Sequence, residues 1–112
     1  MHVAVTIDRR LSVEEVWPMR VQCTLIDAAG KEWIFEDKHV IFTTADINTK
    51  SDFPQTGSIR CRIVETRVQQ DGRTTVVVDT ELPDHVESTT GETRFDVFAE
   101  QLEGPLVQEA NE

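Results

Sequence analysis

Residues 58–80, SIRCRIVETRVQQDGRTTVVVDT, contain two alternating runs separated by Asp71-Gly72. Apolar residues at every second position are typical of strands. An Asp-Gly pair between two such runs favours a type I′ hairpin turn, because both central residues of that turn need positive φ. One face of each run is apolar: Ile59, Cys61 and Ile63 in the first, Val76 and Val78 in the second. The stretch therefore predicts an antiparallel hairpin with two long arms.

The same period of two continues on both sides of this hairpin and predicts further strands at 3–7, 19–25, 33–35, 39–43 and 95–99. Between the first two, Ser12 and Glu15 have capping-box spacing, but Pro18 limits this segment to one or two helical turns at most. The expected fold is all-β, a small antiparallel barrel or strongly coiled sheet of about six strands, OB-like or similar. A β-sandwich is the alternative.

A chain of 112 residues has the usual size of one domain. We expect the domain to cover residues 1–102, followed by an acidic and disordered tail at 103–112. No charged leader precedes an apolar run at the N-terminus, and no apolar run approaches membrane-spanning length. The prediction is a cytoplasmic protein without a membrane partner, in which Cys23 and Cys61 are reduced, buried thiols.

The net charge of −10 is concentrated towards the C-terminus. Residues 1–78 carry 11 acidic and 10 basic groups, whereas residues 79–112 carry 10 acidic groups and one base, Arg94. Such an end repels nucleic acid and attracts basic proteins or cations. Solubility alone is the simpler interpretation.

The segment 81–92, ELPDHVESTTGE, places Asp84, His85 and Glu87 within four residues. Several carboxylates on a short loop suit a hard cation. However, the segment lacks the alternating acidic order of the best-known calcium loop and any paired-histidine spacing. We therefore predict no metal site and no cofactor, with these three residues as weak metal candidates. An acidic surface loop is the simpler interpretation.

Catalysis has few candidates in this sequence. Glu65 shares strand parity with the apolar face of the first hairpin arm, and Asp79 ends the second arm, so either carboxylate is a candidate general acid or base. The simpler interpretation is a carboxylate in water or one paired to an arginine across the hairpin. There is no G-x-S-x-G motif and no phosphate-binding loop. Whether the protein is an enzyme stays open, with a non-catalytic role favoured.

Binding roles remain, and the charge favours a protein over a nucleic acid. The leading hypothesis is a non-catalytic, acidic binding protein that recognises a basic protein, such as an inhibitor, immunity-type or adaptor domain. Its candidate contacts are Trp17, Phe53, Asp84, His85 and Glu87, although the two aromatic rings would also suit plugs at the barrel ends. One alternative is an OB-like single-stranded nucleic-acid binder that uses Arg60, Arg62 and Trp33. The other is a small metal-dependent enzyme or metal sensor.

Overall fold

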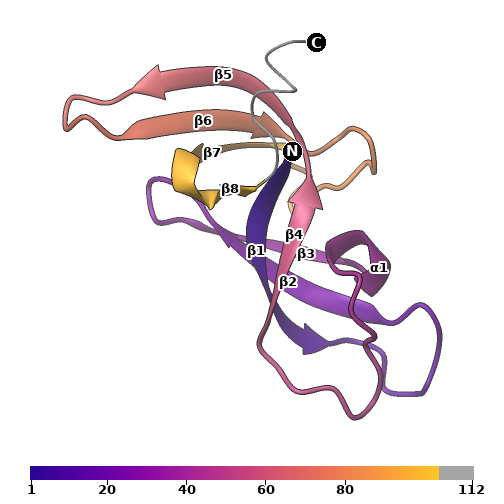
Figure 1. Ribbon diagram of the computed structural model, residues 1–112. Coiled ribbons are helices and arrows are strands. Elements are labelled where there is room, and N and C mark those ends of the chain that lie inside the picture. The colour runs from indigo at the N-terminus through magenta and orange to yellow at the C-terminus, as the bar shows by residue number, and fades with distance from the viewer. Residues whose placement is uncertain (104–112) are drawn as a thin grey trace.

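The computed structural model describes residues 1–103 (Figure 1). Within this range nearly all of the regular secondary structure is strand, which confirms the all-β prediction. The elements in chain order are β1 (His2–Arg10), β2 (Arg20–Ile26), β3 (Glu32–Lys38), α1 (His39–Phe42), β4 (Gln55–Arg60), β5 (Arg62–Val68), β6 (Thr74–Asp79), β7 (Arg94–Phe98), the 3-10 turn η1 (Ala99–Gln101) and β8 (Leu102–Glu103).

The strands form two antiparallel sheets. The first has the order β3-β2-β1-β4, with β8 also paired to β1, and the second has the order β5-β6-β7. Cys61 alone separates β4 from β5, so one extended path passes from the first sheet into the second (Figure 1). Within residues 1–103 no strand pairing closes the two sheets into a barrel.

The core follows from the alternation that the sequence predicts. The buried apolar face of β1 consists of Val3, Val5 and Ile7. The apolar face that leads into and along β2 consists of Met19, Val21, Cys23 and Leu25, and each of these four is 0 % exposed. Burying one such side chain stabilises the fold by about 1.5–3 kcal/mol. Phe95 of β7 meets Phe35 of β3 edge to face, with ring centroids 5.5 Å apart. This contact joins the two sheets around one core.

The predicted strand at 39–43 is wrong, because His39–Phe42 form the single helical turn α1. His39 and Phe42 are both buried, at 2 % exposure each. Residues three apart share a face of a helix but lie on opposite faces of a strand, so only a helical turn buries both. The turn is held by Met19, which lies just before β2: its amide donates to His39 Nδ1 at 3.0 Å.

The hairpin around Gly72 is confirmed, but two of its details differ from the prediction. Its first arm is divided at Cys61, and only β5 pairs with β6, while β4 pairs with β1. The turn is not type I′, because Gly72 has positive φ (85°) and Asp71 does not. The Gln69 amide donates to the Arg73 carbonyl and the Gly72 amide to the Gln69 carbonyl, which is a three-residue loop with glycine in the left-handed position.

The segment between β1 and β2 contains no helical turn, although its residues have capping-box spacing. Both capping side chains have other partners. Ser12 Oγ accepts from the Arg20 amide at 3.0 Å, and the Glu15 carboxylate accepts from Thr49. These contacts hold the segment as an irregular loop.

The last described residues belong to the first sheet. In β8, Leu102 pairs with Val3 and Glu103 with His2, so Glu103 is part of the first sheet. The remainder of the predicted tail lies outside the described residues. Within residues 1–103 no helix is long and apolar enough to span a membrane.

Candidate binding groove

Trp17 lies on the loop between β1 and β2, and 75 % of its surface is exposed. Its ring stands edge-on to the buried His39, with centroids 6.2 Å apart. Val13 and Val16 of the same loop are exposed to 85 % and 46 %, and Val40 of α1 to 45 %. Scattered exposed apolar residues are ordinary, but an exposed tryptophan that lines the same hollows as Val16 and Val40 is typical of a contact surface.

Of three adjoining hollows, two are lined by the Trp17 ring and the third extends away from it. The first, of about 370 Å³, is lined by Glu15, Val16, Trp17, Asp46, Ile47, Asn48, Thr49 and Lys50. The second, of about 410 Å³, is lined by Trp17, His39, Val40, Thr43, Thr44, Ala45 and Asp46. The third, of about 580 Å³, continues past Val40, Thr43 and Thr44 to β4, Arg60, Asp84 and Glu103. Because neighbouring hollows share lining residues, we treat them as one feature, the groove.

One wall of the groove is held by a clamp between two loops. The Glu15 carboxylate accepts hydrogen bonds from the Thr49 amide at 3.1 Å and the Thr49 hydroxyl at 2.6 Å. These bonds from Thr49 lower the pKa of Glu15, which is therefore ionised at neutral pH. The clamp fixes the Trp17 loop against the loop that follows α1, so the ring is presented by a defined backbone.

The floor of the groove depends on a glycine. A β-carbon at Gly57 would lie 2.9 Å from the Ile7 side chain and 3.0 Å from the backbone oxygen of Phe42. Real β-carbons do not approach other atoms so closely, so Gly57 lets the end of α1 pack directly on β4. This packing shapes the third hollow.

Acidic groups outnumber basic ones along the groove. Its lining includes Glu15, Asp46, Asp84 and Glu103 on the acidic side and Lys50 and Arg60 on the basic side. Arg60 and Asp84 form an ion pair at 2.5 Å, and this bond raises the pKa of Arg60. Because those two charges neutralise each other, the rest of the lining carries an excess of negative charge.

The acidic segment 81–92 is more firmly packed than a simple solvated loop. Val86 and Ser88 are 1 % and 4 % exposed, and the Thr80 hydroxyl donates to the Val86 carbonyl at 2.6 Å. The Thr89 amide donates to the Ile34 carbonyl of β3, which ties the loop to the first sheet. Its anchors are therefore small and apolar side chains, and its exposed charges stand on a fixed support.

The three candidate residues of this segment do not converge. Asp84 is half-buried and pairs with Arg60 in the groove, whereas His85 and Glu87 are exposed. His85 has a positive φ of 54°, which marks a tight backbone turn. Within residues 1–103 no group of three or more histidine, cysteine, aspartate or glutamate side chains is placed to hold a metal ion.

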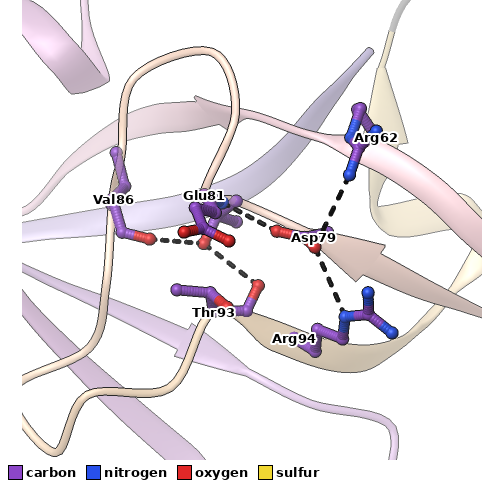
Figure 2. A network of polar contacts seen from close by, with 7 residues as sticks. Arg62, Asp79, Glu81, Val86, Thr93 and Arg94 are labelled. Atoms are coloured by element: carbon purple, nitrogen blue, oxygen red, sulfur yellow. Dashed lines mark hydrogen bonds and ion pairs between the residues drawn. The ribbon is translucent and has the colours of Figure 1, made fainter.

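Asp79 sits at the point where β6 enters this loop, and it is 3 % exposed (Figure 2). One carboxylate oxygen accepts from the Glu81 amide at 2.8 Å. The other faces Arg94 Nε at 3.3 Å and an Arg62 nitrogen at 3.8 Å. Arg62 is its cross-strand neighbour on β5. The geometry fits the paired-arginine interpretation, in which Asp79 anchors the loop to β5 and β7.

Glu65 does not face the interior. The register of β5 against β6 shifts between Ile63 and Glu65, because one extra residue is inserted there. A bulge of this kind reverses the inward and outward parity of the residues that follow it. Glu65 is consequently exposed and forms an ion pair with Arg67.

The three residues of the nucleic-acid hypothesis, Arg60, Arg62 and Trp33, also do not lie together. Arg60 and Arg62 belong to different sheets, and each faces a carboxylate, Asp84 and Asp79 respectively. Trp33 is half-buried, and its indole nitrogen donates to a carboxylate of the adjacent turn. These groups do not form a shared platform for stacking bases.

Of the two aromatic residues proposed for partner contact, only Trp17 is exposed. Phe53 is half-buried against the core, which matches its interpretation as a plug. Sequence reasoning did not identify Val40, Thr43 or Thr44 as groove residues, and a strand at 39–43 would have placed Val40 and Thr43 differently. Comparisons with protein-family models, curated proteins and solved structures found no match.

Proposed function

We propose that this protein is a non-catalytic binding protein whose groove accepts an extended, basic segment of another protein. The observation that carries the proposal is Trp17, 75 % exposed on a clamped loop above an acidic groove. Tryptophan is enriched among the residues that dominate binding energy, because a rigid ring buries a large area at low entropic cost. A fixed, exposed tryptophan is therefore suited to anchor a partner.

Charge supports a basic partner. The groove lining carries acidic groups at Glu15, Asp46 and Glu103 that form no ion pair within residues 1–103, and the chain as a whole carries −10. Lysine and arginine side chains of a partner would be attracted into the groove, and the exposed acids at Glu81 and Glu87 would steer its approach. A polyanion such as a nucleic acid would be repelled by the same field. The roles that fit are those of an inhibitor, an immunity-type protein or an adaptor.

Two further proposals concern how the sheets close and where the protein is located in the cell. We infer that the sheets coil around their common core as a partly open barrel, with a sandwich as the alternative. Support comes from two backbone hydrogen bonds between the sheets: the Thr89 amide ties the β6–β7 loop to Ile34 of β3, and the Ala28 amide ties the β2–β3 turn to Asp96 of β7. We also place the protein in the cytoplasm, an assignment supported by the buried thiol of Cys23, which forms no disulfide within residues 1–103.

The test is selection of binding peptides from a displayed random library, followed by titration of the selected peptides against the full chain. The selected peptides should be rich in lysine and arginine, and their affinity should fall as salt is raised. Trp17→Ala should weaken binding at least about tenfold. Ile26→Ala is the matched control, since Ile26 is 53 % exposed at the other end of β2. Selected peptides without basic residues, or equal binding to Trp17→Ala, would overturn the proposal.

A further inference from the structure

The strand β5 forms an exposed edge of the second sheet. Within residues 1–103 it pairs with β6 on one side only, and its hairpin with β6 projects from the rest of the fold (Figure 1). From Val64 to Val68 every side chain is exposed, and the two valines are exposed to 42 % and 74 %. An open edge with β-branched side chains is a template for pairing with another strand.

The backbone of this edge is oriented for such pairing. At the base of the turn, the Gln69 amide donates to the Arg73 carbonyl, which makes Gln69 and Arg73 a hydrogen-bonded pair. Hydrogen-bonded and non-hydrogen-bonded pairs alternate along an antiparallel ladder. The amide and carbonyl groups of Thr66 and Val68 therefore point away from β6, towards the open side.

The side chains of β5 are symmetric about Thr66. The sequence Val64-Glu65-Thr66-Arg67-Val68 has a valine at each end and opposite charges on either side of the centre. If a second copy pairs antiparallel with its Thr66 opposite this Thr66, each Glu65 lies opposite an Arg67 and each Val64 opposite a Val68. Moving the axis by one residue would place two arginines or two glutamates opposite each other. Charge therefore selects one register.

Charged residues usually protect an edge strand from pairing. Here the signs alternate so that a second copy in this register meets only opposite charges. Within one copy, Glu65 already pairs with Arg67, and both side chains are about half exposed, at 52 % and 50 %. In the paired state each of these groups would keep a partner of opposite sign and gain another.

We propose that two copies of this chain associate through β5, with a twofold axis at Thr66 and a continuous sheet formed by β5, β6 and β7 of both copies. The surface is distinct from the groove, so this inference does not depend on the proposed function. The contact is a short strand pair with two ion pairs, so the association should be weak and concentration-dependent.

Sedimentation of the full chain at concentrations up to about 1 mM tests the proposal. The wild type should form a dimer, and Glu65→Arg or Arg67→Glu should each weaken it about tenfold or more, because like charges then lie opposite each other. An equimolar mixture of the two variants should restore association, since every facing pair then has opposite signs. The double variant with both changes should also form a dimer.

A backbone variant provides an independent measurement. Thr66→Pro removes an amide that points to the open side, so β5 keeps its ladder with β6 and the unfolding midpoint stays close to that of the wild type. This variant should be monomeric. A wild type that is monomeric at about 1 mM would overturn the proposal. A dimer that is unaffected by Glu65→Arg, Arg67→Glu and Thr66→Pro would also overturn it.

Discussion

Trp17 and Trp33, the two tryptophans of the chain, lie at opposite ends of β2 and have contrasting surroundings. Trp33 is half-buried, donates to Asp27 at 2.9 Å and stands edge-on to Phe95, with centroids 5.3 Å apart. Lys31 Nζ lies 4.0 Å above its ring. Trp17 is 75 % exposed, and its ring contact is with the edge of His39.

Trp33 therefore stabilises the fold, whereas Trp17 is presented on the surface. Trp33 has a hydrogen-bond acceptor for its indole N–H and ring contacts with Phe95 and Lys31, so its contacts contribute to the free energy of unfolding. Trp17 gains little from folding, and an exposed tryptophan promotes unwanted association. Its presence on a clamped loop is therefore better explained by a partner than by stability. Four measurements test this contrast between the two tryptophans.

The largest expected effect is on stability. Trp33→Ala should lower the free energy of unfolding by about 3 kcal/mol, because it empties the space against Phe95 and removes the bond to Asp27. Trp17→Ala should change it by less than about 0.5 kcal/mol. Urea unfolding followed by circular dichroism measures both. Equal losses in the two variants would show that Trp17 also supports the fold.

The next effect concerns the carboxylates beside the two rings. Asp27 accepts from the Trp33 indole and from the Ala29 and Lys31 amides, so Asp27→Asn should cost about 1–2 kcal/mol of unfolding free energy. Glu15→Gln at the Trp17 end should leave the unfolding midpoint close to that of the wild type, because this carboxylate holds an exposed loop. Thermal unfolding of the two variants distinguishes these outcomes.

The pH dependence of stability should follow Asp27. Burial alone would raise the pKa of Asp27, but the hydrogen bonds from Trp33, Lys31 and Ala29 outweigh it and lower the pKa. A lowered folded-state pKa adds stability that is present above the unfolded-state value and is lost as the pH falls through the folded-state value. Urea unfolding from about pH 6 to pH 3 should therefore show a steeper loss in the wild type than in Asp27→Asn. Parallel curves would contradict this assignment.

The smallest effect is spectroscopic and does not perturb the fold. In Trp33→Phe the remaining Trp17 should emit at long wavelength and be quenched efficiently by acrylamide. In Trp17→Phe the remaining Trp33 should emit at shorter wavelength and be quenched less. A blue-shifted, protected Trp17 would mean that the loop folds over its ring in solution, and the groove would then lack its anchor.

The sequence predicts the elements whose side chains alternate. Met19 to Leu25 and Val76 to Val78 follow a period of two, and the structure buries the expected faces. Gly72 also marks the hairpin correctly, although the turn type depends on the φ of Asp71, which the residue pair does not determine. Local pattern is sufficient where one face of a strand meets the core along its whole length.

Prediction from the sequence fails where contacts between residues far apart in the chain determine the local structure. His39 forms a helical turn because Met19, twenty positions earlier, offers its amide to the imidazole. Glu65 faces solvent because a single inserted residue shifts the register. The exposure of Trp17 and the groove depend on the Glu15 clamp to Thr49, which joins loops that are far apart in the sequence. No local pattern contains such contacts.

Whether the groove binds a basic peptide is tested most directly by proton–nitrogen correlation spectra of the full chain, recorded during titration with one of the selected peptides. The two indole signals report separately on Trp17 and Trp33. The expected result is a large shift of the Trp17 indole and of the Val40, Thr43 and Thr44 amides, with the Trp33 indole unchanged. Shifts confined to the Trp33 end or to the segment 81–92, with Trp17 unaffected, would show that the groove is not the binding site.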